Sequence, residues 1–242
     1  LLFLAGPLAG LFFQASPAKI VLTAVEKEVA GSLAVTLLAS FGATLTGAMG
    51  AIPLAYLLAR RKFWGKGIIT GLIDLPVVIP HTAAGIALLG VISRDTLPGQ
   101  AAEALGLSLV GSPVAIALAM MFVSIPFLIN AARNGFEAVP VHLEYAALSL
   151  GASPSRVFFT ISLPLAWRSI VTGLVMMFAR GMSEFGAVVI VAYHPMTAPV
   201  LIFDRFNNFG LSYATPVAIL FVTVSLVFFI AIRLLARNKN HA

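Results

Sequence analysis

Five long apolar runs restrict this chain to folds that exist inside a lipid bilayer. They lie near residues 29–59, 67–92, 113–132, 165–192 and 213–236. Each is long enough for an α-helix to cross the hydrocarbon core, which takes about 20 residues. The chain starts at Leu1 without a methionine, and we expect residues 1–13 to be the remainder of a sixth span. The prediction is an all-α integral membrane protein with about six transmembrane helices.

The composition agrees with a membrane location and argues against nucleic acid as a partner. Hydrophobic residues make up 60% of the chain and charged residues 10%, whereas about a quarter of the residues in soluble domains are charged. The net charge is +6, but the basic residues gather at the ends of the apolar runs, as the positive-inside rule predicts. The sequence has no cysteine, which excludes disulfides and thiolate metal sites and leaves the redox compartment open.

The positions of lysine and arginine predict the orientation of the chain. One side collects ten of them: Arg60, Arg61, Lys62, Lys66, Arg133, Arg156, Arg168, Arg233, Arg237 and Lys239. The other side has four: Lys19, Lys27, Arg94 and Arg205. The richer side is predicted to be cytoplasmic, which places both termini inside the cell. We interpret the basic cluster at 60–66 as an orientation signal only. Residues 1–242 are predicted to form a single transmembrane domain.

A polar interruption at residues 136–164 is predicted to form a cytoplasmic helix-turn-helix. After Pro140, apolar residues follow helical spacing and make one face; they are Leu143, Ala146, Ala147 and Leu150. Gly151 ends this helix, Ser153 and Pro154 start a second one, and Pro164 is expected to stop it. Two short helices cannot bury this face on each other. It either docks into a groove of another polypeptide or lies on the bilayer as an ordinary amphipathic helix.

The second span carries two prolines four residues apart, and we expect its helix to kink or break there. A broken helix within a membrane is tolerated where it faces protein or a water-filled cavity, which points to a permeation path. A kink used only for packing is the alternative. Asp74 is expected to pair with a nearby basic group, and His81 to be a satisfied hydrogen-bonding side chain. The candidate path residues in this span are Pro76, Pro80, Thr82 and Gly85.

The span at 165–192 contains two opposite charges that are expected to pair. Arg180 and Glu184 are four residues apart, so on a helix they face the same way. Charges within a bilayer cost several kcal/mol unless they are paired or hydrated, which makes them functional candidates. The alternative is a pair that only fixes helix packing. We expect Glu184 to have a supporting or gating role, since it would repel an anion, and we add Ser183 to the candidate path.

Two further features concern contacts. A small residue recurs at every fourth position of the first span and would allow close helix packing, within the chain or with a second copy; the residues are Ala39, Ala43, Gly47, Ala51, Ala55 and Ala59. The connection at 94–112 is predicted to be an external loop with one short helix near 101–105. Any partner of this loop would be an extracytoplasmic protein.

The polar interruption also resembles the cytoplasmic coupling loop of ABC importer permeases, which sits in a cleft of the ATP-binding subunit. The resemblance rests on the pair Ala146-Ala147, on Gly151 after three further residues, and, after nine more, on Ile161, Leu163 and Pro164. One position departs from the family pattern: Tyr145 stands where a glutamate is usual, and the carboxylate is at Glu144. The residues that the resemblance assigns to ATPase coupling are Glu144, Tyr145, Ala146, Ala147, Gly151, Arg156 and Pro164.

Two other motifs resemble permeases for tetrahedral oxyanions. They are the Ala-Arg-x-x-x-Glu-Phe-Gly run at 179–186 and the Leu-Pro-x-x-x-Pro run at 75–80. The sequence Val-Ile-Pro-His-Thr at 78–82 is most similar to permeases of the molybdate and tungstate type. Sulfate or thiosulfate permeases are the alternative. The resemblance implies a homodimer in the cell membrane, two cytoplasmic ATPase subunits and an extracytoplasmic oxyanion-binding protein.

The chain lacks the motif that it would need to hydrolyse ATP itself. Gly65-Lys66 is the only Gly-Lys step, Arg60 stands where the first glycine of a Walker A motif belongs, and Gly67 follows instead of serine or threonine. We therefore expect no catalytic residue, metal or cofactor in this chain, with ATP and magnesium used by the partner subunit. The alternatives are an ion-coupled secondary transporter, for which only Glu184 and Asp74 could bind the ion, and a membrane scaffold that transports nothing.

Overall fold

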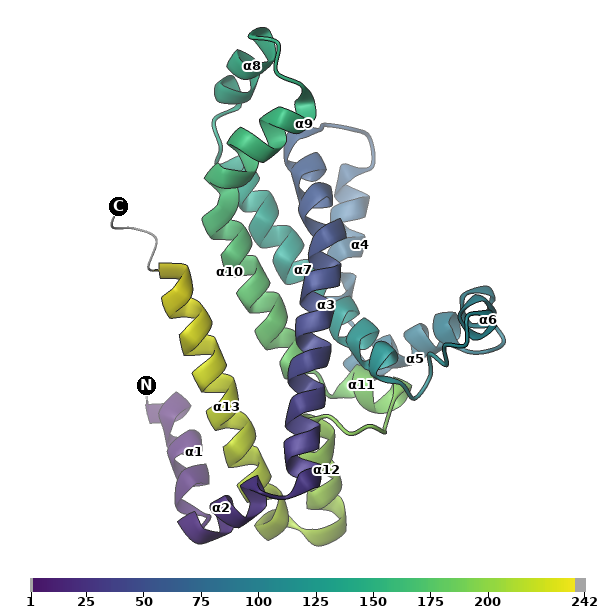
Figure 1. Ribbon diagram of the computed structural model, residues 1–242, viewed down its shortest axis with the longest axis vertical. Coiled ribbons are helices and arrows are strands. Elements are labelled where there is room, and N and C mark those ends of the chain that lie inside the picture. Colours follow the sequence, from purple (N-terminus) through teal and green to yellow (C-terminus); the bar gives the residue numbers. More distant parts are fainter. Residues whose placement is uncertain (1, 238–242) are drawn as a thin grey trace.

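The computed structural model describes residues 2–237, and these form α-helices and no strand (Figure 1). The elements are α1 (Leu2–Phe13), α2 (Pro17–Ala24), α3 (Lys27–Arg60), α4 (Lys66–Val78), α5 (His81–Ile92), α6 (Leu97–Ala104), α7 (Pro113–Glu137), α8 (Val141–Ser149), α9 (Pro154–Val157), the π-helical turn η1 (Phe158–Ser162), α10 (Leu163–Met182), α11 (Gly186–Val191), α12 (Ala198–Phe209) and α13 (Leu211–Arg237). The all-α prediction is confirmed. Lys239, part of the charge count, lies outside the described residues.

Four helical segments are long and apolar enough to cross a membrane. They are α3, α7, the continuous run Pro154–Met182, and Leu211–Ala231 within α13. The pair α4 and α5 passes the same test only when taken together, so the described residues contain four or five spans. The 12 residues of α1 are fewer than the roughly 20 that a span needs. Its assignment as part of a sixth span therefore stays a prediction.

Three helices start at a Ser-Pro step, which explains where they begin. The serine hydroxyl accepts a hydrogen bond from the backbone N–H three residues later, and proline fits the first helical position because it has no N–H to satisfy. The three serines are Ser16 of α2, Ser112 of α7 and Ser153 of α9. The predicted cap at Ser153 is thereby confirmed.

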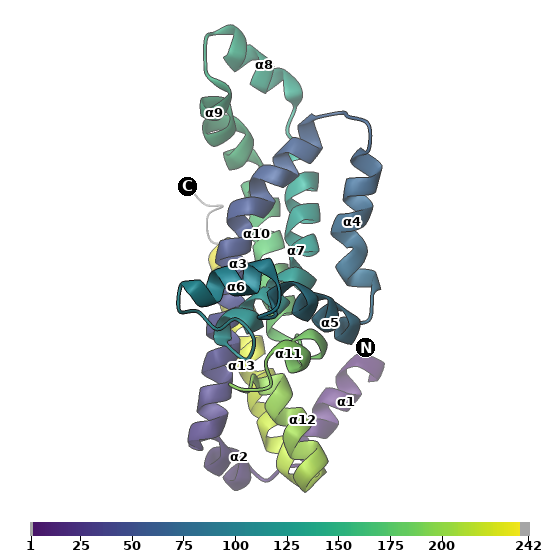
Figure 2. The same ribbon diagram turned by 90° about the vertical axis from the view of Figure 1, so that its right-hand side faces the viewer.

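The centre of the bundle is the packing of α3 against α7 and α10, which lie side by side in both views (Figures 1 and 2). The small residues of α3 point into this contact, and Ala43, Ala51 and Ala55 are at most 2% exposed. At Gly47 a Cβ atom would lie only 2.6 Å from Met177 of α10. The stripe therefore packs within its own chain, which resolves the choice between a self-contact and a second copy.

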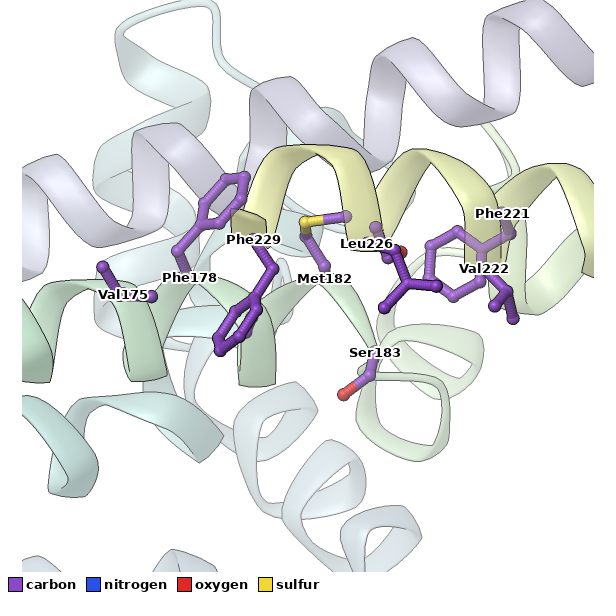
Figure 3. Close-up of a pocket in the computed structure, with 10 residues that line it drawn as sticks. Val175, Phe178, Met182, Ser183, Phe221, Val222, Leu226 and Phe229 are labelled. Carbon is purple, nitrogen blue, oxygen red and sulfur yellow. The ribbon is translucent and has the colours of Figure 1, made fainter. Parts of the chain in front are cut away.

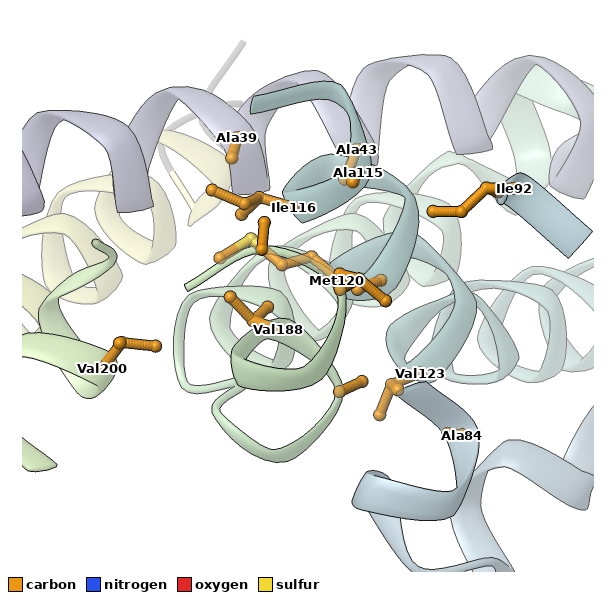
Figure 4. Packing of buried hydrophobic residues seen from close by; sticks show 14 residues of the cluster. Ala39, Ala43, Ala84, Ile92, Ala115, Ile116, Met120, Val123, Val188 and Val200 are labelled. Atoms are coloured by element: carbon orange, nitrogen blue, oxygen red, sulfur yellow. The ribbon is translucent and has the colours of Figure 1, made fainter. Parts of the chain in front are cut away.

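A second part of the core joins α3 and α7 to the short helices α5 and α11 (Figure 4). Its centre is formed by Ile116 and Met120 of α7 and Val188 of α11, which are fully buried. Within a bilayer such side chains stabilise the bundle through close van der Waals packing, since lipid is as apolar as the core. The two short helices are thus held in place by the same core that holds the long ones.

The second predicted span is not one helix. It divides into α4 and α5, which meet at an angle of 115°. Ile79 has an extended backbone (ψ 149°) and Pro80 stands at the N-cap of α5, because the residue before a proline is forced out of the helical region. Pro76, in contrast, lies inside α4 without ending it. The prediction that the helix kinks or breaks at these prolines is confirmed as a break at Pro80.

The predicted span at 165–192 also ends earlier than expected. α10 stops at Met182, a short turn follows, and α11 begins at Gly186. The carboxylate of Glu184 accepts a hydrogen bond of 2.9 Å from the backbone N–H of Ala187, in the first turn of α11. A carboxylate that accepts from a backbone N–H in the first turn satisfies a donor that a helix start leaves free, and its negative charge suits the N-terminal end of the helix dipole. Glu184 therefore lies in a turn between two helices.

Candidate functional site

The segment at 136–164 forms a hairpin that projects from one end of the bundle (Figure 1). We call it the 136–164 hairpin. α8 follows Pro140 and ends at Ser149, and α9 starts at Pro154. Figure 2 shows α8 beyond the ends of α3 and α4, and α9 returning toward the bundle. A projecting element of this kind is available to a second protein.

Gly151 makes the turn of the hairpin. Its φ is +86°, in the left-handed region that favours glycine. The N–H of Ala152 bonds to the carbonyl of Ala147 at 3.0 Å, and the N–H of Gly151 to that of Leu148 at 3.0 Å. These are the bonds of a Schellman-type helix end, which satisfies the last carbonyls of α8. The glycine predicted to end the first helix does so.

Pro164 does not stop the second helix of the hairpin, as we expected it to. α9, η1 and α10 form one continuous run, and Pro164 lies at the second position of α10. The preceding turn is a π-helix, in which Leu163 N–H bonds to the carbonyl of Phe158, five residues back. A widened turn before a proline makes room for its ring and removes the need for its missing donor. The hairpin is therefore rigidly continuous with α10.

The apolar face of α8 is uncovered. Tyr145 is 65% exposed and Leu150, at the tip, is 89% exposed, while Val141, Leu143 and Leu148 are each about 40% exposed. Ala146 and Arg156 are also exposed. An exposed cluster of large apolar side chains on a projecting helix is typical of a docking surface. Of the face predicted from the spacing in the sequence, Leu143, Ala146 and Leu150 are exposed and Ala147 is half-buried, whereas Val141, Tyr145 and Leu148 lie on the opposite side of α8.

Glu144 points the other way, into the bundle, and only 6% of this residue is exposed. Arg60 at the end of α3 donates to it from Nε at 2.9 and 3.0 Å and from Nη2 at 2.8 Å. Ser162 of η1 donates at 2.7 Å and Tyr56 at 3.4 Å. Glu144 therefore links the hairpin to α3, and its neighbour Tyr145 is the side chain presented to solvent.

The same partners set the ionisation of Glu144. Burial raises the pKa of its carboxyl group, but the hydrogen bonds from Arg60, Ser162 and Tyr56, together with the charge of Arg60, outweigh burial and lower the pKa below its ordinary value of 4.5. The carboxylate is therefore ionised at neutral pH, as the ion pair requires.

This shift predicts how the contribution of Glu144 depends on pH. A group with a lowered pKa in the folded state stabilises the fold above its unfolded pKa, and this contribution is lost as the pH falls through the folded value. The difference in thermal unfolding temperature between the wild-type chain and Glu144→Gln should therefore be constant near neutral pH and shrink below pH 4.5. A difference that shrinks already between neutral pH and pH 4.5 would contradict this ionisation.

A second polar cluster lies where α5, α10 and α11 meet. Oε2 of Glu184 is 3.0 Å from Nη2 of Arg180 and 2.9 Å from Nδ1 of His81. Nη2 of Arg180 also lies 2.8 Å from the ring of His81. Glu184 is fully buried, whereas the side chains of Arg180 and His81 are 23% and 34% exposed. The structure brings Arg180 and Glu184 together and confirms His81 as a hydrogen-bonding side chain, with Arg180 and Glu184 as partners that the sequence did not predict.

Arg180 and Glu184 offset each other's charge within this cluster. A guanidinium can only donate, and Nη2 of Arg180 lies 2.8 Å from both ring nitrogens of His81. The buried carboxylate has its compensating charge at 3.0 Å, which lowers the cost of the cluster inside a membrane.

Two glycines allow α5 and α11 to approach closely. A Cβ at Gly85 would lie 2.8 Å from Cβ of Ile190 and 2.9 Å from the carbonyl oxygen of Ala187. A Cβ at Gly186 would lie 2.8 Å from Cβ of His81. The contact between the two short helices therefore holds His81 against Glu184.

The other predicted path residues are divided between the core and the surface. Pro76 is buried, and Pro80, Thr82 and Ser183 are exposed. Asp74 accepts a hydrogen bond of 2.6 Å from the amide of Asn130. This corrects the expected pairing with a basic group, since no ion pair to Asp74 occurs among the side chains that the structure describes. An amide satisfies the carboxylate without a second charge.

A cavity of about 300 Å³ lies between α10 and α13 (Figure 3). Its lining is Val175, Phe178, Ala179, Met182, Ser183, Phe221, Val222, Ser225, Leu226 and Phe229. Two serines are the polar side chains in this set. An anion that entered it would lose its hydration without gaining a charged partner, which costs many kcal/mol. This cavity is therefore not a path for an anion.

Comparisons with known proteins agree with this geometry. Residues 51–241 match the family model described as binding-protein-dependent transport system inner membrane component. The molybdate/tungstate transport system permease protein WtpB of Thermococcus kodakarensis is 42% identical over 240 residues, covering 98% of this chain and 92% of that protein. The probable sulfate transport system permease protein of Chlorokybus atmophyticus is 36% identical over 207 residues, covering 84% and 72%.

The fold is also that of a solved importer subunit. A chain from the crystal structure of the bacterial alginate ABC transporter, in complex with an alginate-pentasaccharide-bound periplasmic protein, matches with a TM-score of 0.78 at 17% identity. The match covers 97% of this chain and 88% of that one. At this identity the similarity concerns the arrangement of helices.

Proposed function

The chain belongs to the family of binding-protein-dependent transport system inner membrane components, and from that premise we propose that it is the membrane-spanning permease subunit of an ATP-driven importer for a tetrahedral oxyanion, most specifically molybdate or tungstate. Two copies enclose the path, and each docks one cytoplasmic ATPase subunit. An extracytoplasmic binding protein delivers the anion. The subunit lies in the cytoplasmic membrane with both termini inside, and ATP and magnesium are used by the partner.

The observation that carries this proposal is the uncovered apolar face of the 136–164 hairpin. Tyr145, Leu148 and Leu150 are exposed at the end of an element that projects away from the bundle. The hairpin is also continuous with α10 through η1. A push on the hairpin from a docked ATPase would therefore reach α10, α11 and the cluster around Glu184 as a rigid-body movement.

The charge balance in the cluster of His81, Arg180 and Glu184 would allow an anion to pass and also to be released. Thr82 and Ser183 are exposed beside it and can donate hydrogen bonds to an oxyanion. Arg180 is offset by Glu184 at 3.0 Å, so the path has no net positive charge there to hold a dianion. Selectivity then resides mainly in the binding protein.

The substrate is argued from the relatives. The relative named for molybdate and tungstate is more similar to this chain, and over more of its length, than the relative named for sulfate. Sulfate is the second candidate, because it is also a tetrahedral dianion and differs chiefly in size. A polar path without a cationic site does not by itself discriminate between molybdate, tungstate and sulfate.

Uptake by proteoliposomes tests the function. The chain, its ATPase and its binding protein would be reconstituted together, and uptake of molybdate, tungstate and sulfate measured with and without ATP. We expect ATP-dependent uptake of molybdate and tungstate and no uptake without the ATPase. Uptake by the chain alone would instead support an ion-coupled transporter, and a complete system that moves none of the three anions would contradict the proposal.

Replacing Leu150 with aspartate tests the docking face directly. The side chain is 89% exposed in the isolated chain, so the fold should be unaffected, whereas a charge placed in an apolar interface should weaken ATPase association roughly tenfold or more. Pull-down of the ATPase by the purified permease measures this. The matched control is Leu97→Asp in α6, where the side chain is 83% exposed. Equal association of both variants would place the ATPase elsewhere.

A further inference from the structure

Arg60 joins the 136–164 hairpin to a helix that the chain does not connect to it. The hairpin continues covalently from α7 and into α10, but α3 ends at Arg60 and leads away into α4. Besides its three hydrogen bonds to Glu144, Arg60 donates from Nη2 to the backbone carbonyl of Val139 at 3.1 Å. It therefore binds the hairpin on both sides of Pro140.

The environment of Arg60 differs from that of an arginine that only sets membrane orientation. Its side chain is 12% exposed and that of Glu144 is 8% exposed, while the next two basic residues, Arg61 and Lys62, are exposed. An exposed charge is sufficient for orientation. A buried fork-shaped donor with two separate acceptors instead fixes the relative position of the elements that it joins.

The rings beside this ion pair stiffen the same junction. Tyr56 of α3 packs edge-on against Phe136 at 5.2 Å and against Phe158 of η1 at 4.9 Å between ring centroids. Ser162 of η1 donates to the same Glu144 oxygen as Arg60 Nη2. The ends of α3 and α7, the hairpin and the start of α10 therefore meet around one carboxylate.

α3 is suited to carry a movement away from this junction. With 34 residues it is about 50 Å long, and it packs against α7 and α10 along its course. Toward its other end, Thr36 accepts a hydrogen bond of 2.8 Å from the backbone N–H of Ala198, at the start of α12. A displacement of α3 would thus reach a part of the bundle far from the hairpin.

We propose that Arg60 is a positioning residue that transmits movement of the 136–164 hairpin to α3, so that α3 and α10 move together when a docked ATPase drives transport. This inference rests on the proposed function, because it requires a partner that moves the hairpin. Glu144 acts with Arg60 as the other half of the link. The docking face itself is formed by other side chains.

The test is a conservative change at Arg60 in the complete complex. Arg60→Lys keeps the positive charge and the membrane orientation, but one ammonium group cannot reach Glu144 and the Val139 carbonyl with the same fork. We expect ATPase association and ATP hydrolysis to be retained, and the anion transported per ATP to fall roughly tenfold, a typical change in coupling. The matched control is Arg61→Lys at the neighbouring exposed arginine. We expect this variant to transport as much anion per ATP as the wild type.

The outcomes separate the two proposals. Unchanged transport per ATP in Arg60→Lys would overturn the positioning role and leave the proposed function intact. Loss of ATPase association in this variant would also overturn it, because Arg60 would then only shape the docking surface. Failure of the wild-type chain to associate with an ATPase would overturn the proposed function and the inference with it.

A distance measurement provides a readout beyond transport. The sequence has no cysteine, so cysteines introduced at Leu57 of α3 and Ser155 of α9 in one copy of the dimer, assembled with cysteine-free partner subunits, give a single pair of spin labels. In the wild-type complex, the label-to-label distance should stay narrow and unchanged on ATP binding, because the two elements move together. In Arg60→Lys it should broaden or shift when ATP binds. A wild-type distance that changes with ATP as much as the variant's would overturn the link.

Discussion

Replacing Arg180 with methionine is expected to destabilise the chain by about 3–5 kcal/mol, because the change leaves a buried carboxylate without its compensating charge. Glu184 is 0% exposed and its Oε2 lies 3.0 Å from Arg180. His81 lies 2.9 Å from the same oxygen, but an imidazole carries a positive charge only when protonated, whereas a guanidinium is always charged. Thermal unfolding of the purified protein in detergent measures the loss.

The two members of the pair should not be equivalent. Arg180 is 23% exposed while Glu184 is fully buried, so after Glu184→Gln the guanidinium can turn toward water, and the amide can still accept from Ala187 N–H. The loss should therefore be smaller for Glu184→Gln than for Arg180→Met.

The double variant Arg180→Met with Glu184→Gln is the control for this prediction. Removing both charges should recover most of the stability, since a buried pair replaced by neutral groups is often tolerated. If Arg180→Met alone has wild-type stability, Glu184 must be hydrated or protonated, contrary to the buried cluster. If the double variant is no more stable than Arg180→Met, the charge imbalance is not the cause of the loss.

Local patterns in the sequence predicted the elements whose cause is local. The break before α5 follows from Pro80, and the turn of the hairpin from Gly151, whose φ of +86° suits glycine. The Arg180–Glu184 spacing predicted their proximity, although Glu184 lies in a turn. In each case the residues that decide the outcome are within a few positions of each other.

The remaining features depend on contacts between distant segments, which periodicity does not encode. His81 meets Arg180 across 99 positions and Arg60 meets Glu144 across 84. Arg60 lies in a run of basic residues that fits an orientation signal, and nothing in that run predicts its contact with Glu144. The position of Glu144 itself was a signal, because the carboxylate lies one residue before the place where a glutamate is usual in the family. A shift by one residue turns a side chain by about 100° around a helix, which here directs the carboxylate toward the bundle.

The widened turn before Pro164 and the early end of α10 were missed for another reason. Proline usually marks a helix boundary, and a long apolar run usually marks a continuous helix. Here η1 accommodates the proline, and Glu184 starts a new helix inside the apolar run. Both exceptions occur where the hairpin and the polar cluster are built, so the local rules fail at the two parts of the molecule that carry the proposed function.

Substituting Gly85 with valine should have the second large effect, because it separates α5 from α11. A Cβ there would lie 2.8 Å from Cβ of Ile190, 2.9 Å from the carbonyl oxygen of Ala187 and 3.0 Å from its Cα. The Ala187 atoms belong to the backbone, so no side-chain rotation relieves the clash. Overpacking of this kind costs about 1–3 kcal/mol, and any outward shift of α5 withdraws His81 from Glu184. We expect a lower unfolding temperature and loss of uptake in the reconstituted importer.

Gly90→Val, one and a half turns further along α5, is the matched control. Nothing lies within 4 Å of a Cβ at Gly90, and valine is a better helix former than glycine. This variant should therefore have wild-type or slightly higher stability and normal uptake. If both variants lose stability and uptake alike, the loss does not arise from the contact between α5 and α11. If Gly85→Val folds and transports as the wild type does, then close contact between α5 and α11 is not required, and the cluster of His81, Arg180 and Glu184 has no role in the path.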